Sequence, residues 1–254
     1  MFKIPDEAAS LIVFGQGREE AFPKPHFKLL VWNVWKGRRG DIWAKDFLRL
    51  AEDTDLILLQ EAVTTPMMSQ LFQRPENRHE WLMAVSFAWK YATHTTGVMT
   101  GSAVHAKTRK FLRGSERELF FWTPKVTLAT QYSVKNREDL LVINTHVVNF
   151  TSTTAFVRFV RELSGLITHH KGPVILAGDF NTWNTDRWTW LEKILISEGL
   201  WPVNFHGDPR FMKLDHVFVR GLKPINAHVQ ADIRSSDHYP LLAEFEILKN
   251  DEKA

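Results

Sequence analysis

The most apolar segments of this sequence run directly into a carboxylate, an amide or an imidazole. Continuous apolar segments of about four to eight residues are typical of strands buried on both faces. An acid at the end of such a strand is costly unless it is paired or bound to a metal. The residues in question are Asn33, Glu61, His146, Asp179, Asn181, Asp215, Asp237 and His238. The sequence therefore predicts polar groups held on rigid backbone at the ends of buried strands.

The spacing of apolar residues predicts alternating strands and helices. Strands are expected at 27–34, 55–60, 98–105, 126–134, 140–146, 173–177, 214–219, 227–233 and 241–247, and helices at 41–52, 66–72, 155–170 and 185–197. This order predicts an α/β chain with a mixed sheet, or with two sheets covered by helices. Residues 74–96 are interpreted as polar and irregular, and 1–26 as an irregular lead-in to a single domain at 27–254.

Composition excludes several classes of site. The chain has no cysteine, which excludes disulfides, thiolate zinc sites, iron–sulfur clusters and cysteine nucleophiles. Its net charge of +3 is not typical of a dedicated nucleic-acid binder. No apolar segment approaches the roughly 18 residues of a membrane helix, and the N-terminus does not resemble a secretory signal. We therefore expect a cytoplasmic protein without a transmembrane segment; its oligomeric state leaves no mark in the sequence.

Each of these polar residues also has a purely structural interpretation. Asp or Asn after a strand is a common turn former or helix cap, and Glu61 could cap the helix that follows it. His146, taken alone, is typical of a core histidine whose hydrogen bonds are satisfied. Five separate clusters at strand ends are harder to explain as coincident turns. Their joint pattern favours one cleft at which the strand ends converge.

These residues also carry a resemblance to a known family. In chain order, the segments NVWKG, LLQEA, INTHVVNF, AGDFNTW, LDHVFV and SSDHYPLLAEF resemble motifs of the endonuclease/exonuclease/phosphatase superfamily, which includes deoxyribonuclease I, abasic-site endonucleases, neutral sphingomyelinases and inositol polyphosphate 5-phosphatases. The segments GVMT, HVVNF, AGDFN and SDHYPLL are most similar to its bacterial YafD-like proteins. The resemblance implies a four-layer α/β fold, a two-sheet mixed β-sandwich flanked by helices as in deoxyribonuclease I.

The resemblance further implies a metal-dependent hydrolase of phosphoester bonds. Glu61 would be the main ligand of Mg²⁺ or Mn²⁺, with the amide oxygen of Asn33 beside it. Asp237 would lie near the metal, as a ligand either directly or through water. Mg²⁺ takes oxygen ligands, so the lack of cysteine costs such a site nothing. Whether one metal or two bind stays open.

The same resemblance implies roles for the remaining polar residues. Asp179 would orient and deprotonate the attacking water, and Asn181 would hold that water or a phosphate oxygen. His238 would donate to phosphate as an imidazolium buttressed by Asp215. His146 aligns with a histidine that contacts phosphate or protonates the leaving group. Abasic-site endonucleases carry tyrosine there, which argues against a close copy of that subgroup.

Substrate-binding residues are harder to assign. Asn149 is either a phosphate contact or a turn residue, and Lys36 and Arg38 could hold a polyanion at the cleft mouth or lie in a solvated loop. The basic stretch 107–117 could likewise face the substrate or the solvent. Four aromatic residues could stack bases or touch lipid, and Trp183 has the best claim because it follows Asn181 closely. The four are Trp81, Phe87, Trp89 and Trp183.

Three functions remain open. The first is a Mg²⁺-dependent nuclease or nucleic-acid phosphodiesterase, which the basic stretches favour. The second is a phosphodiesterase or phosphatase acting on phospholipids or inositol phosphates, which His146 and the aromatic residues favour. The third is an inactive binding module of the same fold. The intact set of Asn33, Glu61, Asp179, Asn181, Asp215 and His238 weighs against the third.

Overall fold

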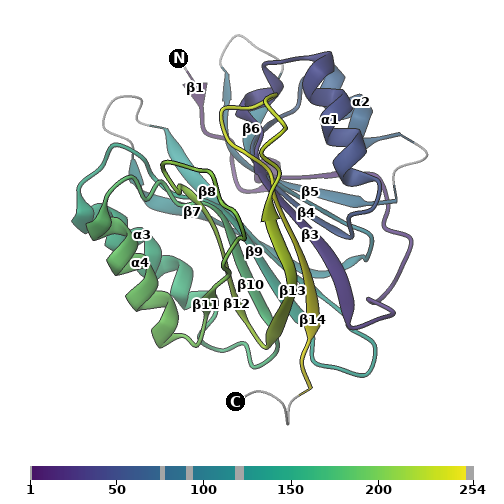
Figure 1. Ribbon diagram of the computed structural model, residues 1–254. Coiled ribbons are helices and arrows are strands. Elements are labelled where there is room, and N and C mark those ends of the chain that lie inside the picture. Colours follow the sequence, from purple (N-terminus) through teal and green to yellow (C-terminus); the bar gives the residue numbers. More distant parts are fainter. Residues whose placement is uncertain (1, 75–77, 90–93, 118–122, 250–254) are drawn as a thin grey trace.

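The computed structural model describes residues 2–74, 78–89, 94–117 and 123–249, and these form two β-sheets stacked face to face (Figure 1). Helices α1 (Asp41–Ala51) and α2 (Pro66–Phe72) cover the outer face of one sheet. Helices α3 (Thr153–Gly165) and α4 (Thr185–Ser197) cover the outer face of the other. The four layers confirm the predicted mixed β-sandwich flanked by helices.

The first sheet joins strands from both ends of the chain. Its order is β1-β5-β6-β4-β3-β14-β13, and β2 also pairs with β5. The strands are β1 (Phe2–Lys3), β2 (Leu11–Phe14), β3 (His26–Asn33), β4 (Leu56–Val63), β5 (Glu80–Trp89), β6 (Thr95–Ser102), β13 (Leu222–Val229) and β14 (Leu241–Ile247). Only β3 and β4 run parallel, which makes the sheet mixed and brings the carboxyl ends of these two strands side by side.

The second sheet has the order β11-β12-β10-β9-β8-β7. Its strands are β7 (Ala106–Arg117), β8 (Pro124–Tyr132), β9 (Leu140–His146), β10 (Val174–Asp179), β11 (Trp201–Pro202) and β12 (Asp215–Arg220). Here the one parallel pair is β9 and β10. In the register of this sheet, Asp179 lies opposite His146 on one side and opposite Asp215 on the other.

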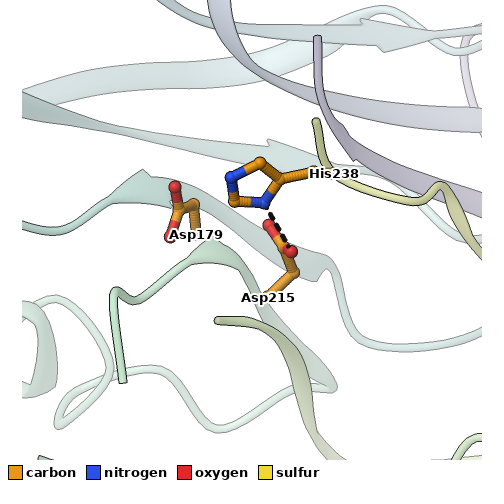
Figure 2. Close-up of side chains that lie close together, drawn as sticks. All are labelled: Asp179, Asp215 and His238. Carbon is orange, nitrogen blue, oxygen red and sulfur yellow. Dashed lines mark hydrogen bonds and ion pairs between the residues drawn. The ribbon is translucent and has the colours of Figure 1, made fainter. Parts of the chain in front are cut away.

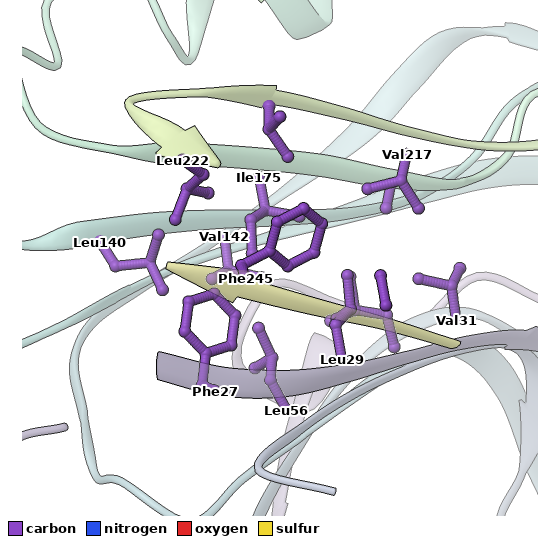
Figure 3. Packing of buried hydrophobic residues seen from close by; sticks show 14 of the residues in the cluster. Phe27, Leu29, Val31, Leu56, Leu140, Val142, Ile175, Val217, Leu222 and Phe245 are labelled. Atoms are coloured by element: carbon purple, nitrogen blue, oxygen red, sulfur yellow. The ribbon is translucent and has the colours of Figure 1, made fainter. Parts of the chain in front are cut away.

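Successive side chains along each strand point to opposite faces of the sheet, and this divides the core into three apolar layers. Leu29 and Val31 of β3 point between the sheets, while Leu30 and Trp32 point outward onto the helices. The layer between the sheets is built almost entirely of aliphatic and phenylalanine side chains (Figure 3). Its labelled members are Phe27, Leu29, Val31, Leu56, Leu140, Val142, Ile175, Val217, Leu222 and Phe245.

Buried polar contacts join the two sheets near the carboxyl ends of β4 and β9. The Gln60 amide donates to Asn144 Oδ1 at 2.7 Å. Asn144 in turn donates to the carbonyl oxygen of Met99 at 2.9 Å. Both side chains are fully buried. A buried amide pair of this kind has directional bonds, so it fixes how one sheet lies over the other more strictly than apolar contacts do.

Helix starts follow local sequence signals. Ser152 caps α3, because its hydroxyl accepts from the backbone N–H of Ala155 at 3.2 Å. Asn184 caps α4 in the same way through the N–H of Arg187, at 2.8 Å. Pro66 occupies the first turn of α2, where its missing N–H costs nothing. Among the described residues, no helix combines the length and apolar character that crossing a membrane requires.

The segment 74–96 differs from its sequence interpretation. Its described part contains β5, a mostly buried strand in which Trp81 is fully buried; residues 75–77 and 90–93 lie outside the described residues. Polar flanks hid the apolar run WLMAVSF, which is long enough for a strand. Within the stretch 1–26, β1 and β2 pair with β5. The basic stretch 107–117 forms β7 at the edge of the second sheet, where charge hinders pairing with other chains.

Candidate active site

A cleft of about 450 Å³ opens where the polar strand ends of both sheets meet. Asn33 and Glu61 reach it from the parallel strands β3 and β4 of the first sheet. His146 and Asp179 reach it from the parallel strands β9 and β10 of the second. The predicted convergence of strand ends is therefore found in the structure. Further predicted residues that line this cleft are Lys36, Arg38, Asn149, Asn181, Asp237 and His238.

Asp179 lies buried at the centre of this arrangement. Its Oδ2 accepts from the Asn33 amide at 2.9 Å, and its Oδ1 accepts from the backbone N–H of Asn181 at 3.0 Å. Burial, followed by the charge of the neighbouring Asp215, raises the pKa of Asp179 to about 7. A carboxylate with this pKa and fixed orientation is suited to accept a proton from water near neutral pH.

His238 and Asp215 form a bonded pair next to Asp179 (Figure 2). The distance from His238 Nδ1 to Asp215 Oδ2 is 2.8 Å. Burial disfavours the charged ring, but the charge and hydrogen bond of Asp215, with Asp179 and Asp237, raise the pKa of His238 to about 10. His238 is therefore an imidazolium at neutral pH, with its Nε2–H left to donate.

His146 has the opposite charge state. Burial, together with the nearby charges of Lys125 and Lys36, holds the pKa of His146 well below its usual range, so the ring is neutral. Its Nε2 lies 3.2 Å from the Lys125 ammonium, which donates to it, and 3.4 Å from Asp179 Oδ2. The two histidines of the cleft thus differ, one neutral and one charged.

Sequence reasoning missed Lys125. It is a single basic residue near the start of the buried strand β8, in the segment PKVTLATQY. Pairing of Thr127 with Thr145 carries it to the His146 end of β9, where it lines the cleft. The available signal was a lone lysine in an apolar strand. Its significance depends on strand register, which the sequence alone does not give.

Glu61 is held charged at the cleft. Its Oε2 forms an ion pair with Lys36. Burial opposes ionisation, but Lys36 and then Lys125 lower the pKa of Glu61 below its usual value. Asn33 Oδ1 accepts from the backbone N–H of Trp35 at 3.1 Å. Asp237 is exposed, and the hydroxyl of Ser236 donates to its Oδ1 at 3.3 Å.

Two groups of side chains could hold a divalent cation. Ligand atoms of Asp179, Asp215 and His238 lie within 4.8 Å of one another, and Asp215 Oδ1 is buried with no hydrogen-bond partner among the described residues. However, a charged His238 in that group repels a cation. Glu61, Asn33 and Asp237 offer oxygen donors only, and the Glu61 carboxylate already attracts the Lys36 ammonium. The oxygen donors of this second group fit Mg²⁺ or Mn²⁺.

Strained backbone gathers around the cleft. Six described residues other than glycine have φ values between 45° and 61°, in the left-handed region. Five of the six lie in segments that line the cleft: Trp35, Lys36, Glu61, Phe150 and Asn181. Such conformations cost about 1–3 kcal/mol each and persist only where the surroundings impose them. Their clustering supports a functional role for this end of the molecule.

The aromatic candidates divide into three environments. Phe87 and Trp89 line the cleft, together with Phe150, which the sequence analysis did not single out. Trp81 is fully buried beneath the helices of the first sheet, so its proposed contact with a substrate is wrong. Trp183 lines a neighbouring groove of about 560 Å³ rather than the cleft itself.

Comparison with known proteins agrees with this geometry. Residues 30–238 match the model of the Endonuclease/Exonuclease/phosphatase family, a span that contains every candidate residue named above. A UPF0294 protein of Erwinia tasmaniensis is 36% identical over 251 residues, which cover 96% of this chain and 90% of the relative. A UPF0294 protein of Yersinia enterocolitica is 37% identical over 240 residues, covering 91% and 89%.

Solved structures share the fold at low sequence identity. An endonuclease/exonuclease/phosphatase from Beutenbergia cavernae superposes with a TM-score of 0.69 at 17% identity, covering 88% of this chain and 72% of that one. ANGEL2, described as a 2′,3′-cyclic phosphatase, gives 0.66 at 14% identity, with coverage of 96% and 99%. A mannosyl-6-phosphatase of Bacteroides thetaiotaomicron gives 0.63 at 17% identity, with coverage of 86% and 99%. At these identities the likeness is one of fold.

Proposed function

Because this chain belongs to the endonuclease/exonuclease/phosphatase family, within its YafD-like UPF0294 group, we propose that it hydrolyses phosphoester bonds with the help of Mg²⁺ or Mn²⁺. The activities in the family's name all cleave such bonds. One observation carries the proposal: Asp179, whose pKa lies near 7, stands between the charged pair of His238 with Asp215 and the neutral His146. This arrangement combines a base, an anion-binding donor and a positioned lysine in one cleft.

Asp179 is the proposed base. It would accept the proton of the attacking water while the Asn33 amide and the Asn181 N–H hold its two carboxylate oxygens in place. Asn181 offers its own side chain less freely, because its amide donates to the Val147 carbonyl at 2.9 Å. The amide oxygen of Asn181 therefore remains to orient the water.

His238 is the proposed phosphate-binding donor. Its Nδ1–H is held by Asp215, so its Nε2–H would donate to a non-bridging phosphate oxygen. The charge on the ring offsets the negative charge that grows on that oxygen in the transition state. Lys125 and Lys36 add positive charge to the same cleft, and Lys125, with the neutral His146, would face the leaving group.

Glu61, Asn33 and Asp237 would hold the metal. When bound, the cation would polarise the phosphoryl oxygen as a Lewis acid and stabilise developing negative charge. Its site would share the Asn33 side chain with Asp179, since Asn33 offers its oxygen to one side and its amide N–H to Asp179 on the other. Asn33 would thus fix the base relative to the metal.

Nucleic acid is the favoured substrate class. The cleft carries the cations Lys36, Arg38 and Lys125, and the aromatic side chains of Phe87, Trp89 and Phe150 lie along it. Cations that neutralise phosphates next to rings on which bases stack are typical of single-stranded nucleic-acid binding. The same aromatic residues also suit a phospholipid or inositol phosphate, which is the second candidate. An inactive binding module is disfavoured, because the predicted catalytic set is intact.

A substrate panel tests the proposal. Single- and double-stranded nucleic acids, sphingomyelin vesicles, inositol phosphates and bis(p-nitrophenyl) phosphate are assayed with Mg²⁺, with Mn²⁺ and with EDTA. We expect metal-dependent hydrolysis, strongest on nucleic acid and falling steeply with salt. A preference for vesicles or inositol phosphates would favour the second candidate substrate class. If no substrate is hydrolysed, the proposal of a hydrolase is wrong and an inactive binding module is favoured instead.

Matched variants test the assigned roles. We expect Glu61→Gln and His238→Asn to lose at least about a hundredfold in kcat while remaining folded. Glu246→Gln is the control, because Glu246 is a charged residue near the opposite end of the first sheet, paired in register with His26. Full activity in either cleft variant would contradict the role given to that residue.

A further inference from the structure

Arg187 is the only lysine or arginine that is fully buried among the described residues. It lies in the first turn of α4, immediately behind the turn that carries Asp179 and Asn181. No role for Arg187 was predicted from the sequence, and its side chain does not line the cleft. A buried charge is costly, so its presence here requires an explanation.

Both ends of the Arg187 guanidinium bind oxygen atoms of the two segments that follow β9 and β10. Nη1 donates to the carbonyl oxygens of Asn181 and Val148, at 3.0 and 3.1 Å. Nη2 donates to the carbonyl oxygen and the hydroxyl of Thr151, at 2.9 and 3.0 Å. The guanidinium carbon lies 4.8 Å from the ring centres of both Phe156 and Trp183. Arg187 therefore joins two segments that lie about 30 residues apart in the sequence.

These two segments carry side chains of the cleft. Residues 147–151 hold Asn149 and Phe150, and residues 179–183 hold Asp179 and Asn181. Phe150 and Asn181 have φ values of 45° and 52°, in the left-handed region. Strained residues of this kind keep their conformation only when their surroundings enforce it. The hydrogen bond from Arg187 to the carbonyl oxygen of Asn181 holds the peptide group that follows this strained residue.

The electrostatics of Arg187 point away from a purely stabilising role. No carboxylate forms an ion pair with it among the described residues. Burial lowers the pKa of Arg187 to about 10, so it remains charged at neutral pH. A positive charge in the first turn also opposes the dipole of α4. An apolar residue would avoid all of these costs, although it would leave the loop carbonyls unbound.

We propose that Arg187 is a positioning residue, whose planar fork fixes Asn181 and the Asn149–Phe150 turn in the geometry that hydrolysis requires. It acts through these two segments and does not touch the reacting atoms. The inference rests on the proposed hydrolase function, and it adds to that function a requirement from outside the cleft. It also predicts that lysine cannot fully replace arginine, because an ammonium lacks the planar fork.

Arg220 provides a matched control. Its guanidinium also joins two loops by donating to backbone carbonyls, those of Glu198 and His170. It lies at the far end of the same sheet, because it pairs in register with Val174 at the start of β10, whereas Asp179 ends that strand. Arg220→Met therefore removes a similar tie at a distance from the cleft.

The test compares Arg187→Met, Arg187→Lys and Arg220→Met in kcat, KM, thermal stability and amide hydrogen exchange. We expect Arg187→Met to lower kcat by about tenfold to a hundredfold with KM changed less than about threefold, since misplaced groups slow the chemical step. Arg187→Lys should recover part of this loss. Arg220→Met should lower thermal stability with kcat within about twofold of wild type.

Hydrogen exchange separates this inference from the proposed function. Arg187→Met should speed exchange in 147–151 and 179–183, whereas Arg220→Met should do so only near 168–172 and 198–201. If the wild-type chain cleaves nothing, the proposed function fails, and exchange still reports whether Arg187 holds the two segments. Unchanged exchange there, or a kcat loss no greater than that of Arg220→Met, would overturn the inference. If Arg187→Met does not fold, Arg187→Lys decides, and an unchanged kcat in that variant counts against it.

Discussion

A buried carboxylate near its own pKa is poor for stability and useful for proton transfer. In Asp179 burial and the neighbouring Asp215 disfavour the charged form, while hydrogen bonds from Asn33 and Asn181 support it. The folded chain therefore binds a proton at Asp179 more tightly than the unfolded chain does. The free energy of unfolding must then fall as pH rises from about 4 towards about 7.

Replacing Asp179 with asparagine tests whether this carboxyl group makes the free energy of unfolding fall as pH rises. Without the carboxyl group, the variant should lack that pH-dependent loss, so its stability relative to wild type should grow by about 1–3 kcal/mol between pH 5 and pH 8. Thermal melting in EDTA at both pH values measures it, and activity should fall to background. A relative stability that does not change with pH would show that Asp179 ionises normally.

In His238 the fold stabilises the charged form of the side chain, whereas in Asp179 it disfavours the charged form. The raised pKa of His238 therefore reports a favourable contribution of the imidazolium to the free energy of unfolding. The contribution of the His238–Asp215 pair is fully present below about pH 6.5 and is lost as pH rises towards about 10. Asp215→Asn should therefore cost about 2 kcal/mol of stability at pH 6 and much less near pH 10. Imidazole NMR of the metal-free protein should show His238 charged at pH 8 in wild type and neutral in the variant. A neutral wild-type ring at pH 8 would contradict the assignment.

At the level of the element, the sequence pattern predicted the bounds of a strand or helix correctly where the signals for that element lie within its own residues. The predicted strand 140–146 and helix 185–197 coincide with β9 and α4, because apolar continuity and an Asn cap are local signals. β5 was missed because polar neighbours obscured its apolar run. Lys125 and Arg187 were missed because their partners are distant in sequence. Register and long-range hydrogen bonds are set by tertiary packing, which a linear pattern does not contain.

The packing of β5 on β6 rests on a glycine. A Cβ added to Gly101 would lie 2.4 Å from the Trp81 ring, which is buried and cannot move aside. Gly101→Ala should therefore lower the free energy of unfolding by about 1–3 kcal/mol. Gly165→Ala is the control, because a Cβ at the end of α3 meets nothing within 4 Å and should be neutral or slightly stabilising. Urea denaturation measures both, and equal stabilities of the two variants would contradict the tight packing at Trp81.

On the scale of the whole molecule, the two sheets share one apolar layer. Phe27 and Leu56 from the first sheet pack in it against Leu140 and Ile175 from the second. Neither sheet could keep this face buried alone. The layer also joins β3, near the start of the chain, to β14, near its end. The halves of the chain that supply the cleft are therefore interdependent.

We accordingly expect residues 27–249 to unfold in one cooperative step. Tryptophan fluorescence and far-UV circular dichroism should give coincident urea transitions, and the calorimetric enthalpy should equal the van't Hoff enthalpy. Leu56→Ala, in the shared layer, should lower the free energy of unfolding by about 2–5 kcal/mol, and both probes should report the same decrease. Separate transitions for the two probes would mean that the sheets form independent units.

The buried amide contact between Gln60 and Asn144 has a consequence for how this molecule can change over time. Gln60 immediately precedes Glu61, and Asn144 lies two residues before His146. The sheets are thus aligned by directional bonds next to the reactive groups, whereas the apolar layer that they share consists of contacts that tolerate exchange of one side chain for another. Substitutions can accumulate in the remote layers, and loops around the cleft can be rebuilt for a new ester, while the spacing between the two halves of the cleft is preserved.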